Sequence, residues 1–265
     1  MKPNAVSEAH ARFLKARKRD ATFVRLSQIG ILLFVLALWE IGADLLWFDP
    51  FILSSPSRIA ATVARLYRDG SLWLHIGTTL METVLGFVLG TALGALFAVL
   101  LWWMPKLNRI LDPYLVVLNA LPKIALGPVL IVWIGAGMAS IVVMGILVSL
   151  VVTTVTVLNG FLATTDEKQL LMRTLGATKL QIFCKVVLPA GVPDLISALK
   201  ISVGMSWVGV IVGEYLVSKA GLGYLIVYGG QVFKLDLVMA SVSVLCILAA
   251  LMYYAVALLE RKIRQ

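Results

Sequence analysis

Long apolar runs alternate with short polar stretches along this chain. The apolar runs lie near residues 27–47, 76–103, 113–135, 138–161, 195–217 and 237–259. Each run is long enough to cross about 30 Å of hydrocarbon as a helix of roughly 20 residues. The runs lack the alternation of a strand, and unpaired backbone groups are too costly in lipid. The sequence therefore predicts an all-α membrane protein with about six transmembrane helices.

Composition agrees with this pattern. Hydrophobic residues make up 60% of the chain and charged residues 14%, and the mean hydropathy is +0.96. These values lie outside the range of soluble domains. The chain has no ATP-binding loop of the G-x-x-x-x-G-K-[ST] type, and Cys184 and Cys246 lack the spacing of a metal site. We therefore expect no ATPase activity, no catalytic site and no metal site in this chain.

Basic residues predict how the chain lies in the membrane. They gather before the first run, after the second, after the fourth and after the sixth: Lys2, Arg12, Lys15, Arg17, Lys18, Arg19 and Arg25; Lys106 and Arg109; Lys168, Arg173, Lys179 and Lys185; Arg261, Lys262 and Arg264. Fewer stand in the alternate segments, namely Arg58, Arg65, Arg68, Lys219 and Lys234. Positive charge favours the cytosolic side. We expect a multi-pass protein of the plasma (inner) membrane with both termini in the cytosol.

The same rule divides the chain and explains its charge. The first apolar run is longer than the core of a cleavable signal peptide, so it is interpreted as a retained anchor. Residues 1–26 are then a basic cytosolic tail, and residues 27–265 are a membrane domain. The net charge of +9 is a topology signal, and we expect lipid and not nucleic acid as a partner of the basic residues.

Two polar segments are predicted on the external side. Residues 48–75 include serines that can cap a helix, followed by Ile59, Val63 and Leu66 on one face, which predicts an amphipathic helix at the membrane surface. Residues 218–236 hold Gly221 and Gly223 without a preceding strand, so they predict a turn between helices and not a dinucleotide site.

The segment 162–194, called the platform segment below, is charged and amphipathic, and its first half predicts a short helix. Thr165 or Asp166 can cap this helix, and Leu170 and Leu171 begin an apolar set at helical spacing. Gly176 permits a left-handed turn that ends the helix.

A second short helix is predicted after this turn. It is expected to expose Leu180, Phe183 and Val187 along one stripe, and to stop at Pro189 and Pro193 before the next span. Two interpretations remain open from spacing alone. The stripe could insert into the groove of a partner, or it could lie against lipid headgroups.

The platform segment also resembles a known signature. Gly176-Ala177, further residues to Lys185, and then Val186-Val187-Leu188-Pro189 are similar to the cytosolic loop of importer permeases of the ATP-binding-cassette (ABC) superfamily. The pattern of that family is Glu-Ala-Ala, a gap, Gly, a longer gap, Ile, any residue and Leu-Pro. This chain departs from it, because Leu170-Leu171-Met172 replace Glu-Ala-Ala.

Four other segments extend the resemblance over nearly the whole chain after residue 30. They are 121–128, 131–135, 213–216 and 220–225, with the sequences LPKIALGP, IVWIG, GEYL and AGLGYL. They look like the subfamily that serves nitrate, aliphatic sulfonates, taurine and related small nutrients. Glu82 is a departure, since many relatives carry a basic residue around that position.

The resemblance implies a fold, a role and a set of partners. The fold would be that of a type I ABC importer permease, also called MetI-like. The partners would be a second copy of the chain, two cytosolic ATPase subunits that bind ATP and Mg, and an external or periplasmic substrate-binding protein. The permease itself would hydrolyse nothing. The ATPase-coupling loop would comprise Leu170, Leu171, Gly176, Ala177, Leu180, Phe183, Val187, Leu188 and Pro189.

Polar residues inside the apolar runs are candidates for the translocation path, because such residues are costly in lipid. The candidates are Lys123, Ser202, Ser206, Trp207 and Glu214. Each has an alternative interpretation. Lys123 could reach the cytosolic headgroups, the serines could bond to their own helix, and Glu214 could gate the path or pair across the dimer. Gly204, Gly209 and Gly213 recur at spacings that allow close helix packing.

Two other classes of protein were weighed. A secondary transporter working without ATP would show an inverted internal repeat, and none is visible. A membrane enzyme would need converging catalytic groups, whereas His10 and His75 are far apart in the sequence. The nutrient itself stays open, with a slight preference for small anions if Lys123 faces the path.

Overall fold

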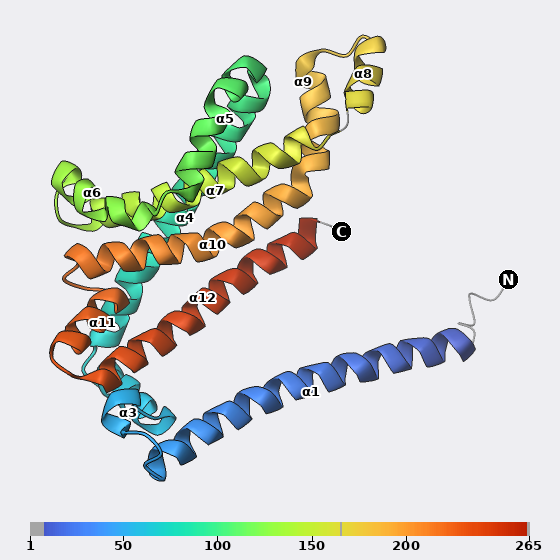
Figure 1. The fold of residues 1–265 in the computed structure, drawn as a ribbon. Coiled ribbons are helices and arrows are strands. Elements are labelled where there is room, and N and C mark those ends of the chain that lie inside the picture. The colour runs from blue at the N-terminus through green and yellow to red at the C-terminus, as the bar shows by residue number, and fades with distance from the viewer. Residues whose placement is uncertain (1–7, 165, 264–265) are drawn as a thin grey trace.

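Helices make up the architecture throughout the described part of the chain (Figure 1), as the sequence predicts. The structure is a computed structural model, and it describes residues 8–164 and 166–263. Its elements are α1 (Glu8–Asp44), α2 (Pro50–Leu53), α3 (Pro56–Arg68), α4 (Ser71–Trp103), α5 (Pro105–Ala120), η1 (Lys123–Leu126), α6 (Gly127–Ile134), α7 (Met138–Leu162), α8 (Asp166–Thr174), α9 (Lys179–Ile182), the π-helical η2 (Phe183–Val187), α10 (Leu188–Val217), α11 (Leu222–Gln231) and α12 (Leu235–Ile263). The described residues contain no strand.

The apolar runs form spans, with one correction. Within the described residues, 5 helices are long and apolar enough to cross a membrane: Phe13–Asp44, Ser71–Trp103, Met138–Leu162, Lys179–Val217 and Leu235–Lys262. The predicted run 113–135 is not a straight span, because α5 and the η1–α6 segment meet at an angle of 89°. Pro122 lacks a backbone donor and keeps Leu121 extended, with ψ at 132°, which ends α5.

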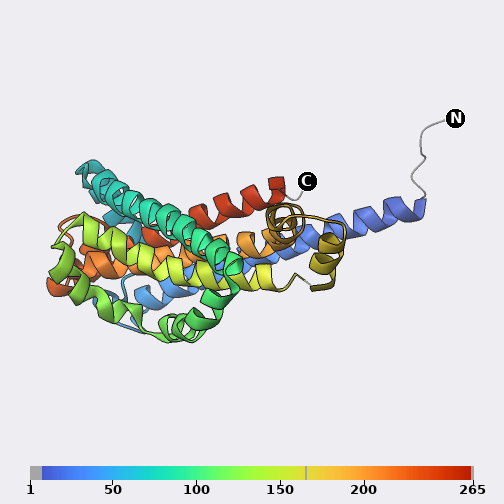
Figure 2. The same ribbon diagram turned by 90° about the horizontal axis from the view of Figure 1, so that it is seen from above.

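Helices α4, α7 and α10 form the centre of the bundle and lie side by side (Figure 2). Small residues let their backbones touch. A Cβ placed on Gly86 of α4 would lie 3.3 Å from the Cα of Gly145 in α7, and one placed on Gly209 of α10 would lie 2.8 Å from the same Cα. Gly145 is therefore the point where three helices meet, and contacts this close exclude any side chain.

Two hydroxyl groups bond to each other inside this packed centre, and a third bonds to a backbone carbonyl. Thr153 Oγ1 of α7 lies 2.6 Å from Ser202 Oγ of α10, and both residues are fully buried. Ser149 Oγ donates to the carbonyl of Gly145 one turn earlier, at 2.8 Å. Buried hydroxyls in membrane helices need such partners because lipid offers none.

Helix α1 diverges from the bundle (Figure 1) and meets it near α3. Its side chains are largely exposed, Phe34 by 68%, as a helix surrounded by lipid requires. The predicted boundary between a tail (1–26) and a membrane domain is not marked by any change of secondary structure, because α1 is continuous through residue 26.

Of the two segments that were predicted on the external side, one has the predicted structure and the other does not. The amphipathic helix exists as α3, and Ser55 caps it by accepting a hydrogen bond from the Arg58 backbone N–H. The segment 218–236 is more than a turn, because it contains the ten-residue helix α11. Sequence spacing missed α11 because its start is stabilised by residues distant in the chain, which are described below.

A matched pair of glycines in α10 tests the packed centre. Gly209→Ala should destabilise the protein by about 1–3 kcal/mol, because the new methyl meets backbone that cannot move aside. Gly204→Ala, where a Cβ would meet nothing within 4 Å, should be neutral or slightly stabilising. Thermal unfolding in detergent compares the two. Equal unfolding temperatures for both variants would show that close backbone contact at Gly209 is unimportant.

Candidate functional site

The platform segment stands at one end of the bundle, where α8 and α9 project beyond the ends of the other central helices (Figure 1). The predicted left-handed turn is confirmed: Gly176 has a φ of +79°. The N–H of Ala177 reaches back to the Met172 carbonyl at 2.9 Å and so closes the end of α8. Thr178 and Gln181 then exchange hydrogen bonds as a capping box that starts α9.

The second platform helix does not stop at the prolines, contrary to prediction. The helical path is continuous from Lys179 to Val217, a length of 39 residues. A π turn at Phe183–Val187 precedes Pro189, and the Leu188 N–H bonds to the Phe183 carbonyl. This wider turn makes room for Pro189, which has no N–H to contribute. The platform is therefore joined directly to the transmembrane helix α10.

The predicted exposed stripe is also wrong in two of its three residues. Leu180 is 59% exposed, but Phe183 is 8% and Val187 is 0% exposed. The Phe183 ring packs against Trp102 of α4 and Phe161 of α7, with centroid distances of 5.0 and 5.5 Å. Phe183 and Val187 therefore fix the platform to the bundle and are not free to enter a partner. The helical spacing of the stripe could not show which residues of α4 and α7 cover its face.

Lys179 also holds the platform segment to the end of α4. Its Nζ donates to the carbonyl of Trp103, at the end of α4, and lies 5.3 Å from the centroid of the Trp103 ring. An ammonium near the last carbonyl of a helix is favoured by the helix dipole, and the aromatic face adds a cation–π attraction.

Apolar side chains remain exposed on the platform. Leu170 and Leu171 of α8 are each 61% exposed, Leu175 is 74% and Leu180 is 59% exposed. We call these four residues the platform patch. Ala177, by contrast, packs against the cluster of Trp102, Phe161 and Phe183, which we call the aromatic cluster. Leu188 and Pro189 are exposed at the base of α10. A projecting apolar patch held by a rigid base fits a protein partner.

The serine and tryptophan candidates for a path lie inside the chain. Ser202 and Ser206 are fully buried and Trp207 is 6% exposed. Ser202 bonds to Thr153 of α7, so it belongs to the packed centre. Ser206 Oγ and Trp207 Nε1 have no hydrogen-bond partner among the described residues. Gly209 and Gly213 of the same helix make the close contacts expected of them, whereas Gly204 makes none.

Lys123 lies at the break that Pro122 creates between α5 and α6. Its Nζ donates to the Asn119 carbonyl at 3.1 Å, at the end of α5, and the side chain is half-buried. None of its hydrogen bonds or ion pairs in the described part of the chain goes to a carboxylate. Lys123 is thus a cation that is held in place but not neutralised.

Glu214 lies where α10 ends, and there it caps another helix. Its Oε2 accepts hydrogen bonds from the backbone N–H groups of Gly223, at 2.6 Å, and Tyr224, at 3.3 Å, in the first turn of α11. A Cβ on Gly223 would lie 2.8 Å from the Cβ of Glu214. The carboxylate is 1% exposed and stands at the positive end of the α11 dipole.

Side chains of α4 complete the cap. His75 Nδ1 accepts from the Gly221 N–H at 3.0 Å, and Thr79 Oγ1 accepts from the Leu222 N–H at 2.7 Å. The N–H groups that a helix start leaves unpaired are all bound here by side chains of α4 and α10. We call His75, Thr79, Glu82, Glu214 and residues 221–224 the α11 corner. Sequence spacing gave no sign of it.

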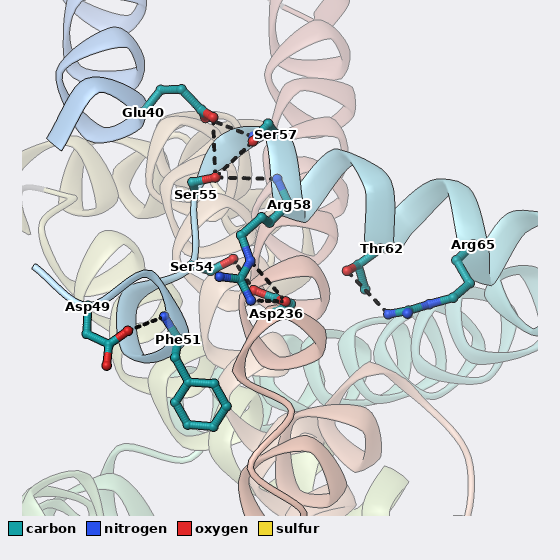
Figure 3. A network of polar contacts seen from close by, with 10 residues as sticks. All are labelled: Glu40, Asp49, Phe51, Ser54, Ser55, Ser57, Arg58, Thr62, Arg65 and Asp236. Atoms are coloured by element: carbon teal, nitrogen blue, oxygen red, sulfur yellow. Dashed lines mark hydrogen bonds and ion pairs between the residues drawn. The ribbon is translucent and has the colours of Figure 1, made fainter. Parts of the chain in front are cut away.

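A polar network ties together α1, α3 and α12 at the end of the molecule that lies away from the platform segment (Figure 3). Arg58 of α3 forms an ion pair with Asp236 of α12 at 2.8 Å, and Ser54 Oγ donates to the same carboxylate at 2.7 Å. Glu40 of α1 accepts from the Ser57 backbone N–H at 2.9 Å. The network joins α1, α3 and α12. Asp236 was missed at the sequence level, although an acid in the first turn of a helix is a recognisable signal.

Known transport proteins are similar to this chain in sequence. The model of the family "Binding-protein-dependent transport system inner membrane component" matches residues 86–265. A "Probable ABC transporter permease protein" of Haemophilus influenzae is 32% identical over 86% of this chain and 91% of its own length. The formylaminopyrimidine transport permease ThiX of Halalkalibacterium halodurans is 31% identical over 86% and 90% of the two chains. The taurine permease TauC of Escherichia coli is 26% identical over 96% and 94%.

Solved structures share the fold. A chain of the inward-facing MetNI methionine ABC transporter has a TM-score of 0.61 at 24% identity, covering 70% of this chain and 92% of that chain. A chain of a bacterial ABC transporter that imports alginate has a TM-score of 0.63 at 16% identity, covering 96% and 100%.

One phenylalanine and one leucine truncation test whether Phe183 is buried and Leu180 exposed on the platform. Phe183→Ala should destabilise the protein by about 3–5 kcal/mol, because it empties the aromatic cluster. Leu180→Ala should change stability by less than about 0.5 kcal/mol, because that side chain is exposed. Thermal unfolding of both variants in detergent provides the measurement. If the two truncations were equally mild, Phe183 would not be buried as described.

Proposed function

The chain belongs to the family of binding-protein-dependent transport system inner membrane components, and from this premise we propose how it works within an importer. It is a multi-pass ABC importer permease and not itself an enzyme. In our proposal two copies form the translocation path, two cytosolic ATPase subunits bind ATP and Mg, and an external binding protein delivers a small nutrient.

The platform patch is the observation that carries this proposal. Four exposed leucines project from the end of the bundle, while Phe183, Val187 and Lys179 hold the base of the platform to α4, α7 and α10. A partner that grips the patch can therefore move the transmembrane helices without bending the platform itself. We propose that α9 is the coupling helix and that the ATPases move the permease between two packed states. In the neighbouring α8, Leu170 and Leu171 stand where the family pattern has Glu-Ala, so the contact between the platform patch and the ATPase would be apolar.

A second copy accounts for apolar surface around the broken segment. Val132 and Trp133 are 81% and 78% exposed, and they lie in the last turn of α6, the helix that follows the break at Pro122 and Lys123. We propose that two such segments face each other across the path. Lys123 would then favour small anions, and the buried Ser202, Ser206, Trp207 and Glu214 would support the path from behind.

The end that carries α3 is the proposed docking side for the binding protein. A cavity of about 230 Å³ there is lined by Arg58, Arg65 and Lys234, with Asp236 and exposed Phe233 beside them. This arrangement suits an acidic surface. A related alginate transporter is known in complex with a substrate-bound periplasmic protein. Relatives named for taurine and formylaminopyrimidine support a small nutrient as cargo, with nitrate and sulfonates as further candidates.

One substitution tests coupling. Leu180→Asp would place a charge in an apolar contact, so we expect the copurified ATPase and ATP-driven uptake each to fall by about tenfold or more. The matched control is Leu53→Asp, an exposed leucine of α2 at the other end, which should leave ATPase retention unchanged. If Leu180→Asp retained the ATPase fully and showed normal uptake, α9 would not be part of the contact with the ATPase. Uptake that persists without any ATPase would favour the secondary transporter.

Labelling tests the orientation. In a background with Cys184→Ser and Cys246→Ser, Leu175→Cys on the platform should react with a membrane-impermeant maleimide only after cells are opened. Asp69→Cys, next to α3, should react in intact cells. Both positions are exposed and lie at opposite ends of the bundle. The reverse labelling pattern would place the platform outside and overturn the proposed orientation.

A further inference from the structure

A cavity of about 390 Å³ lies between the platform segment and the ends of the central helices. Its volume is within the range of about 300–1,000 Å³ that is typical of small-molecule sites. The residues that matter for its chemistry come from α4, from the start of α5 and from α8 and α9: Trp102, Pro105, Asn108, Gln169, Arg173 and Lys179. The cavity is therefore large enough for a ligand and not only for a single water molecule.

The cavity lies at the depth where membrane spans end. The span of α4 ends at Trp103, next to the lining residue Trp102, and the span of α7 ends at Leu162, which also lines the cavity. The helical path to α10 begins at Lys179, in the wall of the same cavity. Adjacent tryptophans are typical of the layer where hydrocarbon meets lipid headgroups. Both lipid headgroups and soluble molecules are present at this depth.

Positive charge faces the cavity without being neutralised. Arg173 of α8 and Lys179 of α9 line it, and none of the described residues that line it is acidic. No ion pair within the described part of the chain involves either residue. Lys179 donates to the Trp103 carbonyl, which leaves further N–H groups of its ammonium free to donate. The cavity therefore favours an anion.

The start of α5 adds to this preference. No side chain caps α5, whose first turn begins with Pro105 in the cavity wall. The uncapped start of a helix presents backbone N–H groups and the positive end of the helix dipole, and both favour phosphate.

Asn108 supplies an acceptor in the same place. Its Oδ1 is buried and has no hydrogen-bond partner among the described residues. A buried acceptor without a donor is costly, so a ligand that brings a donor is favoured. The cavity thus fits a molecule that carries anionic oxygens and, close to them, a hydroxyl group.

We propose that this cavity binds a phosphate ester that carries a free hydroxyl group. The phosphate oxygens accept hydrogen bonds from Arg173 and Lys179, and the hydroxyl donates to Asn108 Oδ1. The headgroup of phosphatidylglycerol and soluble glycerol 3-phosphate share this chemistry. The site goes beyond the transport role proposed above and does not rest on it, because it needs only one chain.

A bound phosphate joins parts of the molecule that are otherwise held indirectly. Helix α8, which carries Arg173, packs mainly on α9. Asn108 and the uncapped helix start belong to α5. A ligand held by both sides therefore ties the first platform helix to the bundle.

The experiment measures binding of two probes to the full chain in dodecyl maltoside. The probes are dioctanoyl phosphatidylglycerol and glycerol 3-phosphate, each titrated by calorimetry at constant ionic strength. Wild-type protein should bind the preferred probe saturably. Arg173→Gln should bind it about tenfold more weakly, because a charge-assisted hydrogen bond is lost. The matched control is Arg109→Gln, an exposed residue of α5 that does not line the cavity, which should bind as the wild type does.

A second variant covers the case in which Arg173→Gln does not fold. Asn108→Asp keeps nearly the same shape but places a negative charge in the cavity. This charge repels phosphate and pairs with the two cations, so binding of the preferred probe should again fall by about tenfold or more.

Comparison of the probes identifies the source of the phosphate. Glycerol 3-phosphate that binds at least as tightly as the lipid identifies a soluble ester, and tighter binding of the lipid identifies a headgroup. Absence of saturable binding for both probes would overturn the proposal. So would wild-type affinity in Arg173→Gln, or an equal loss in Arg173→Gln and Arg109→Gln, because general surface charge would then explain the attraction.

Discussion

Close backbone contact at Gly145 is the constraint on which the rest of the structure depends. Lipid offers no hydrophobic drive for helices to associate, so α4, α7 and α10 hold together by fitting tightly. Gly86 and Gly209 approach Gly145 from two sides, and Thr153 and Ser202 pair about two turns further along α7 and α10. Because these contacts leave no space for a side chain, the three helices can sit in few relative positions. That discreteness is what a transporter with two packed states needs.

The helical path from Lys179 to Val217 connects the two ends of the molecule. At one end it carries Phe183 and Val187, which fix the platform to the aromatic cluster of α4 and α7. At the other end it carries Glu214, which caps α11. The π turn before Pro189 keeps this path unbroken. The platform and the α11 corner are therefore joined by one continuous element, and not by a chain of loops.

Several charged groups of the bundle have fixed partners. Asp236 has Arg58, Glu260 has Lys200, and Glu214 has the start of α11. Glu82 of α4 is buried as well, and its Oε2 has no hydrogen-bond partner among the described residues.

The sequence by itself determined the all-α membrane class, about six apolar runs, the end of α8 at Gly176 and the serine cap of α3, because run length, glycine conformation and capping are local properties. It could not show that Phe183 is covered by Trp102 and Phe161, because period alone does not say what lies opposite a helix face. It also missed α11, whose start is bound by His75, Thr79 and Glu214 from distant segments. Those features were decided by tertiary structure, since they depend on residues that only folding brings together.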